Sequence, residues 1–146
     1  DHGFAMARDV AQDLVMYLRR PGGQSQFSRF LARQAQGEGP IREVQSWALE
    51  NLDADLSVEK LADRAIMSPR NFARVFAQQT GTTPARFVEE VRVEAARARL
   101  EQGRETLDEV ASACGFGTAL TLRRSFEKLL GVTPSDYRER FGLRLA

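Results

Sequence analysis

Apolar residues recur along this chain at intervals of three and four positions, which is the period of an amphipathic α-helix. The central stretch shows the pattern clearly, with Phe87, Val91, Ala95 and Ala98 on one side of a helix. No segment shows the alternation of apolar and polar residues that indicates a half-buried strand. The pattern predicts an all-α chain, with helices over 3–19, 40–52, 57–64, 68–80, 84–102, 106–114, 118–130 and 134–141.

Residues with strong positional preferences mark the ends of these helices. Ser68 followed by Pro69 is a start signal, because serine caps a helix and proline fits its first turn. The run from Thr106 to Glu109 matches a capping box. Glycine readily adopts the left-handed conformation in which many helices end. Glycines occur where three of the helices are expected to stop: Gly81, Gly103 and Gly131.

One helical motif occurs twice, and the second copy begins about 50 residues after the first. The copies span about 57–80 and 106–130, and each is followed by a glycine and then a Thr-Pro pair. Each copy predicts two short helices joined by a tight turn. This arrangement is typical of the helix-turn-helix motif, whose second helix enters the major groove of DNA. The duplication therefore predicts two DNA-reading units.

The helix predicted over 84–102 joins the two copies. Its 19 residues would span roughly 28 Å at 1.5 Å per residue. One turn of DNA rises about 34 Å, so a rigid helix of this length could hold the two units at neighbouring turns of a duplex.

Charge is sorted between the helices of each copy. The segment 68–79 holds Arg70 and Arg74 and no acidic residue, and the segment 118–130 holds three basic residues against Glu127 alone. The segment 53–63 holds four acidic residues against one lysine. Positive charge is therefore concentrated on the second helix of each copy, where phosphates and base edges would lie.

Composition narrows the class of protein without indicating a partner. The chain has 146 residues, of which 42% are hydrophobic and 28% charged, as in ordinary soluble globular proteins. Its net charge is +1, and residues 40–146 hold 16 basic and 16 acidic residues, so a DNA-binding role depends on local charge. No apolar run is long enough to cross a bilayer and no signal peptide is visible, so no membrane partner is expected. The single cysteine, Cys114, fits a reducing cytoplasm.

No catalytic residue, metal ligand or cofactor site is expected. His2 is the only histidine and stands far from Cys114 in the sequence, so no nucleophile has an evident base. Cys114 is interpreted as a small buried packing residue. The charged residues of the central helix, including Glu94 and Arg97, are expected to form a solvated face.

Residues from about 41 to 141 resemble the DNA-binding domain of the AraC/XylS family of bacterial transcriptional regulators. The second copy carries the most specific motif: Ala111-x-x-x-Gly115-Phe116, Phe126, and Gly131-x-Thr133-Pro134-x-x-Tyr137-Arg138. The resemblance implies a seven-helix domain in which a rigid helix joins two helix-turn-helix subdomains. Both recognition helices would enter successive major grooves on one face of double-stranded promoter DNA. RNA polymerase is a further candidate partner.

The resemblance also implies which residues contact DNA. The candidates in the first recognition helix are Arg70, Asn71, Ala73 and Arg74, and those in the second are Ala119, Leu120, Thr121, Arg123 and Arg124. The apolar candidates cannot hydrogen-bond to bases through their side chains but could touch a thymine methyl group. Arg70 and Arg74 are expected to provide the sharper readout. Phosphate contacts are expected at residues that begin helices: Ser57, Thr106 and Thr118.

The beginning of the chain resembles the end of an amidotransferase-like sensor domain, which precedes the AraC-type module in one branch of the family. We therefore expect residues 1–20 to end a sensor domain that this sequence lacks, 21–39 to be a linker, and 40–146 to be the DNA-binding domain. A small-molecule effector, if there is one, would bind the absent domain.

Two alternatives remain open beside a DNA-binding regulator. The net-zero charge of residues 40–146 would also suit a helical protein-interaction module that has lost DNA binding. Because the chain begins like an amidotransferase domain, a third possibility is that it is a fragment of an enzyme, although its 146 residues supply no nucleophile with its base. Exposure of Arg70, Arg74, Arg123 and Arg124 on one common face would favour DNA.

Overall fold

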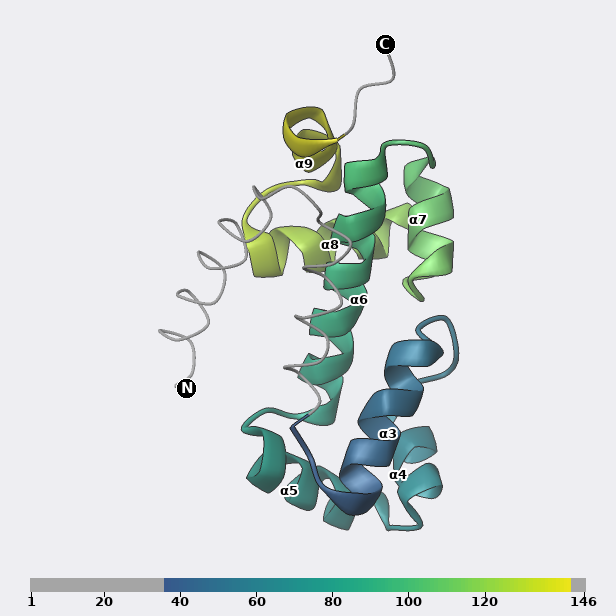
Figure 1. Cartoon of the computed structure of the whole chain (residues 1–146), viewed down its shortest axis with the longest axis vertical. Helices are drawn as coiled ribbons and strands as arrows, with labels where there is room; N and C mark the ends of the chain where they lie inside the picture. Colours follow the sequence, from purple (N-terminus) through teal and green to yellow (C-terminus); the bar gives the residue numbers. More distant parts are fainter. Residues whose placement is uncertain (1–35, 143–146) are drawn as a thin grey trace.

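The computed structural model describes residues 36–142, and within this range the chain forms seven helices and no strand. The helices are α3 (Gly39–Glu50), α4 (Val58–Ala65), α5 (Pro69–Thr80), α6 (Pro84–Gln102), α7 (Leu107–Ala113), α8 (Ala119–Leu130) and α9 (Pro134–Phe141). Figure 1 shows α6 as a central rod, with α3, α4 and α5 around its lower part and α7, α8 and α9 around its upper part. The all-α architecture predicted from the sequence is confirmed.

The predictions for the beginning of the chain concern residues that lie outside the described range. These are the helix expected over 3–19, the linker as far as residue 35, and the resemblance to a sensor domain. Residues 36–38 precede α3 and are not helical.

A serine or threonine caps the start of every helix from α4 to α9. Each capping residue has an extended backbone, and its hydroxyl oxygen accepts a hydrogen bond from the backbone N–H three positions later. The capping residues are Ser57, Ser68, Thr83, Thr106, Thr118 and Thr133. The central helix covers 84–102 as predicted, whereas α8 begins at Ala119 because Thr118 is its cap.

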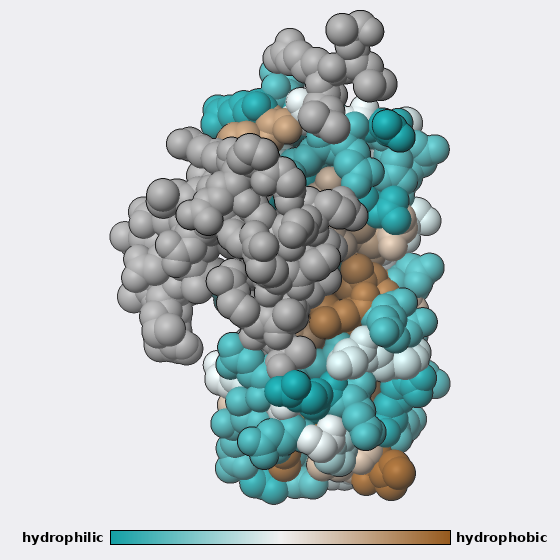
Figure 2. Space-filling model, viewed as in Figure 1, coloured by the Kyte–Doolittle hydropathy of each residue, from teal (hydrophilic) through white to brown (hydrophobic). Residues whose placement is uncertain are grey.

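Buried side chains form two hydrophobic cores, one on each half of α6. The first core joins α3, α4 and α5 to the first half of α6, and the second joins α7, α8 and α9 to its second half. Phe76 contacts Phe72 and Phe87 in the first core, with ring centroids 5.6 and 5.5 Å apart. Phe126 contacts Tyr137 in the second at 5.6 Å. Each helix-turn-helix unit therefore has its own core, and the described surface in Figure 2 is mostly hydrophilic.

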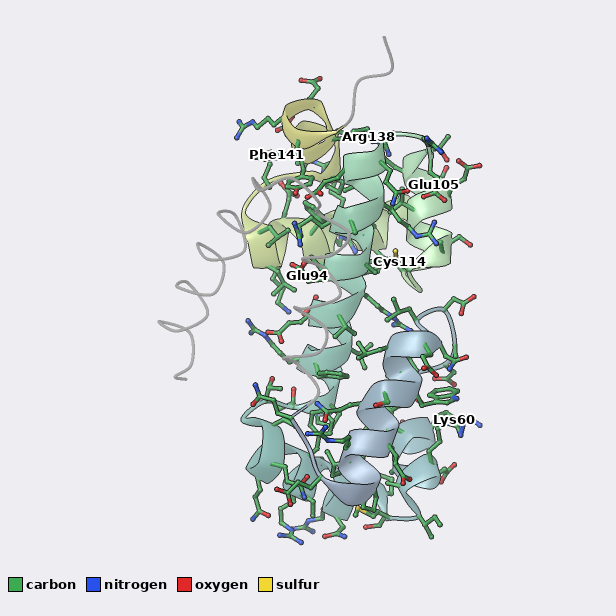
Figure 3. The ribbon with its side chains drawn as sticks, viewed as in Figure 1. Lys60, Glu94, Glu105, Cys114, Arg138 and Phe141 are labelled. Carbon is green, nitrogen blue, oxygen red and sulfur yellow. The ribbon has the colours of Figure 1, made fainter. Side chains whose placement is uncertain are left out.

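The prediction of a solvated charged face on α6 is wrong for Glu94 and Arg97, which are each 1% exposed. Arg97 donates hydrogen bonds to Glu94 and to Glu101, and the hydroxyl of Tyr137 also donates to Glu101. We call these four residues the buried charge network. Helix α9 packs against this side of α6 and excludes water, so the charges are tolerable only because they pair. In Figure 3, Glu94 lies on the side of α6 opposite to Cys114.

Ile66, in the turn between α4 and α5, has an unfavourable backbone conformation and little packing. Its φ of 57° is in the left-handed region, and its side chain is 92% exposed. A β-branched residue there costs about 1–2 kcal/mol. We expect Ile66→Gly to raise the free energy of unfolding by about 1 kcal/mol, because glycine adopts this conformation without strain. Urea denaturation monitored by circular dichroism measures the difference.

Ile66→Ala is the control for this prediction, because alanine removes the exposed apolar surface but keeps the left-handed strain. It should change the stability much less than glycine does. A loss of stability in Ile66→Gly would show that the isoleucine side chain makes a contact that outweighs its strain.

Candidate nucleic-acid interface

The second helix of the first unit, α5, has two distinct faces. Phe72 and Phe76 are fully buried and fix one face in the first core. The candidate residues Arg70, Asn71 and Arg74 are exposed, and Ala73 is half-buried. The core therefore sets the rotation of α5 about its own axis, and that rotation leaves both arginines in solvent.

Arg74 is held by its neighbours on α5. Its Nη2 donates to Oδ1 of Asn71 at 2.6 Å, and its Nη1 lies 3.5 Å from Oε1 of Gln78. These contacts restrict the guanidinium before any ligand is present, which lowers the entropy cost of a later contact. Asn71, which the resemblance makes a candidate for contact with DNA, thus orients Arg74.

The second helix of the second unit, α8, repeats this arrangement. Leu122 and Phe126 are fully buried in the second core. Thr121, Arg123 and Arg124 are exposed. The Nε of Arg123 lies 3.5 Å from a carboxylate oxygen of Glu127, and both side chains are largely in solvent, so this ion pair is weak and easily exchanged.

The apolar candidates on α8 differ in how far they reach solvent. Leu120 is 53% exposed, which is unusual for a leucine within the described part of the chain, whereas Ala119 is half-buried. An exposed leucine at the start of a recognition helix is suited to contact with a thymine methyl group. Ala119 offers less surface for such a contact.

The three predicted phosphate contacts have different surroundings. The hydroxyl of Thr118 accepts from the backbone N–H of Thr121 and contacts the hydroxyl of that residue, so this cap remains polar and exposed. The backbone N–H of Thr106 donates to Glu109, whose carboxylate would repel a phosphate.

The surroundings of Ser57 are also acidic. Its backbone N–H donates to Asp55, and this hydrogen bond lowers the pKa of that carboxyl below its ordinary value. The ionised carboxylate opposes a second anion at this helix start. Of the three predicted phosphate contacts, Thr118 therefore has the most favourable surroundings.

A groove of about 830 Å³ lies between the two units and is lined in part by residues that are not among the predicted DNA contacts. One wall is a face of α8 formed by Thr121, Ser125 and Lys128, which are spaced four and three positions apart. The Nζ of Lys128 lies 3.1 Å from Oε1 of Glu89 on α6. In the sequence, the spacing of four and then three positions from Thr121 indicates that Ser125 and Lys128 share its helix face.

The described residues offer no alternative site of metal or thiol chemistry. Among residues 36–142, no group of three or more His, Cys, Asp or Glu side chains could hold a metal ion. Cys114 follows α7 as its capping residue and is buried, and burial raises the pKa of its thiol to about 11. A thiol with this pKa is a poor nucleophile at neutral pH, which supports its interpretation as a packing residue. No helix in the described part of the chain is long and apolar enough to cross a membrane.

Comparison with known proteins gives matches to regulators of one type. A family model described as a helix-turn-helix domain matches residues 61–140. The HTH-type transcriptional regulator Rv1931c of Mycobacterium tuberculosis is 50% identical over 84 residues, which are 58% of this chain and 32% of that protein. The HTH-type transcriptional regulator ArgR of Pseudomonas aeruginosa is 25% identical over 138 residues, 94% of this chain and 42% of that protein. The chain thus spans less than half the length of these curated relatives.

Two solved structures match the fold over almost their whole length. The DNA-binding domain of AdpA, solved in complex with a target DNA, has a TM-score of 0.68 and 41% identity, covering 71% of this chain and 94% of that one. A regulator of Chromobacterium violaceum described as AraC-type has a TM-score of 0.63 and 27% identity, covering 69% and 90%. The family model covers more than half of the chain, from within α4 to within α9. This chain therefore belongs to the AraC-type helix-turn-helix family.

Proposed function

We propose that this chain is the DNA-binding module of a sequence-specific transcriptional regulator, and that α5 and α8 enter two successive major grooves of promoter DNA. One observation carries the proposal. In both helices, fully buried aromatic or leucine side chains hold one face in a core while the arginines remain exposed. The target DNA in the AdpA structure and the name of Rv1931c support the same function for a member of this family.

The proposed contacts divide between base readout and phosphate binding. Arg70 and Arg74 of α5 would each form paired hydrogen bonds to the O6 and N7 atoms of a guanine, which is the commonest specific contact in the major groove. On α8, Arg123 and Arg124 would contact bases or phosphates, and Leu120 a thymine methyl group. The remaining candidates, which are Asn71, Ala73, Ala119 and Thr121, would line the base edges. Thr118 would contact the DNA backbone, whereas the carboxylates beside Ser57 and Thr106 disfavour a phosphate at those two helix starts.

The rest of the regulator is also a matter of proposal. We infer that an amidotransferase-like sensor domain precedes residue 1, that any effector binds there, and that RNA polymerase is a partner at the promoter. We also infer a cytoplasmic location, where promoter DNA is accessible. The resemblance of residues 1–27 to the end of such a domain supports this inference. Reading the coding sequence upstream of Asp1 tests whether it encodes an amidotransferase-like domain.

Fluorescence anisotropy with promoter DNA from the neighbouring genes tests the proposed function. We expect binding that is tighter than to random duplex and that weakens as salt rises. Each phosphate neutralised should contribute about −0.9 to the slope of log affinity against log salt. Affinity that is insensitive to salt, or equal for the two duplexes, would contradict DNA recognition.

The competing function is a helical protein-interaction module, which the net-zero charge of residues 40–146 favours. The same titration separates the two, because such a module would not prefer promoter DNA at any salt concentration. The third candidate, a fragment of an enzyme, depends on the amidotransferase-like beginning of the chain, which lies outside the described residues.

A further inference from the structure

A direct contact links the two units at a point beside α6. The guanidinium of Arg92, in the middle of α6, donates from Nε to the carbonyl oxygen of Leu52 and from Nη2 to that of Ala54, both at 2.9 Å. Leu52 and Ala54 belong to the loop between α3 and α4 in the first unit. Hydrogen bonds from a charged donor are stronger than neutral ones, and the planar guanidinium presents two of them in a fixed geometry.

The turn of the second unit fits against the same carbonyl group. A Cβ atom on Gly115, in the turn between α7 and α8, would lie 2.0 Å from the carbonyl oxygen of Leu52 and 2.6 Å from Nε of Arg92. Its φ of +90° also disfavours any other residue. The Leu52 side chain packs against both cores. We call Arg92, Leu52, Ala54 and Gly115 the joint.

The joint lies close in sequence to the start of one helix in each unit. Helix α4 begins at Val58, four residues after Ala54, and α8 begins at Ala119, four residues after Gly115. The length of α6 sets the distance between the units, whereas contacts away from its axis resist rotation of one unit about that axis. A second contact between the units is the ion pair of Lys128 on α8 with Glu89 in the first half of α6. Its lysine side chain is 61% exposed, so this pair restrains rotation weakly.

We infer that Arg92 is a positioning residue for two-headed DNA binding: through the joint it fixes the orientation of the second unit relative to the first, and thereby the half-site spacing that the protein accepts. The inference rests on the proposed function. When the two units, or heads, are held at the orientation that matches the two half-sites, binding of one unit places the other at a high effective concentration over its half-site. A looser joint lowers that concentration while each head keeps its own contacts.

The test uses duplexes selected from a random pool by the wild-type chain. One carries both half-sites, others carry them with one to three base pairs inserted or removed, and one keeps a single half-site. We expect Arg92→Ala to bind the parent duplex about tenfold more weakly, to bind the single half-site as the wild type does, and to lose much of the preference for one spacing. Arg92→Lys should behave similarly, because an ammonium group cannot donate to the carbonyl oxygens of Leu52 and Ala54 in the fixed geometry of the guanidinium.

Arg99→Ala is the matched control, since it removes the same charge from the same helix. Arg99 pairs with Glu105 within the second unit and does not join the two units. This variant should keep the wild-type spacing preference. An Arg92→Ala protein that loses affinity equally for single and double half-sites, or that keeps the spacing preference, would overturn the inference.

A measurement without DNA separates failure of the joint from failure of the proposed function. Spin labels at the exposed positions Ala77 on α5 and Glu127 on α8, introduced as Ala77→Cys and Glu127→Cys, report the distance between the two heads. We expect the distance distribution to broaden in Arg92→Ala and not in Arg99→Ala. Identical distributions would overturn the positioning role whatever the DNA result. A wild type that binds no duplex specifically would overturn the proposed function and the half-site spacing with it, and a broader distribution in Arg92→Ala would then show only that Arg92 orients the two units.

Discussion

Replacing Arg97 by alanine should lower the free energy of unfolding by about 3–5 kcal/mol, the largest loss that we expect from a single charged residue here. Arg97 and Glu94 are each 1% exposed, and Arg97 also pairs with Glu101, 3.0 Å away. Without the guanidinium, two carboxylates would remain in or near the second core with no cation between them. Urea denaturation monitored by circular dichroism measures the loss directly.

Two further variants separate this electrostatic effect from a loss of packing. Glu94→Leu combined with Arg97→Met replaces the buried pair by apolar side chains of similar size and should restore much of the stability lost in Arg97→Ala. Arg99→Ala removes a half-exposed arginine from the same helix and should cost only about 0–1 kcal/mol. If Arg97→Ala were no more harmful than Arg99→Ala, the buried charge network would not stabilise the second unit.

Replacing Arg74 by alanine should weaken specific DNA binding by about 1–3 kcal/mol, which is roughly a 5-fold to 150-fold loss of affinity. Arg74 is exposed on α5, so the N–H groups of its guanidinium that do not face Asn71 or Gln78 can reach a guanine. Anisotropy titrations against the selected duplex and against one with the recognised base pair changed give both affinity and discrimination.

Arg74→Lys distinguishes base readout from attraction to phosphates. Lysine keeps the charge but not the paired donors, so this variant should lose discrimination at one base pair and retain the salt dependence. Arg140→Ala, which removes an exposed arginine from α9, should bind almost as the wild type does. Equal affinity and equal discrimination in Arg74→Ala and the wild type would remove Arg74 from the interface.

Features set by a few neighbouring residues could be predicted from the sequence. Ser68 with Pro69, the box from Thr106 to Glu109, and the glycine at position 103 all act within one helical turn. Within residues 36–142, the predicted helix ends therefore fall within about two residues of those in the structure. The exposed positions of Arg70 and Arg74 also follow from local periodicity, because Phe72 and Phe76 fix the opposite face.

Features set by distant contacts could not be predicted in this way. Glu94 and Arg97 look like a solvated pair in sequence, and only the packing of α9, with Tyr137 some 40 residues further on, buries them. The contact of Arg92 with Leu52 likewise joins residues 40 positions apart. Spacing along one helix carries no information about such partners. The identity of the base-contacting residues is still a prediction, because exposure is necessary for contact with DNA but does not demonstrate it.

Methylation protection of guanine N7 on the selected operator tests most directly whether α5 and α8 read DNA together. We expect protection in two major grooves on one face of the duplex, with centres about 10 base pairs apart. Arg74→Ala should lose protection of one guanine in one groove and keep the protection in the other groove. Protection confined to one groove in the wild type, or divided between opposite faces of the duplex, would contradict two-headed recognition.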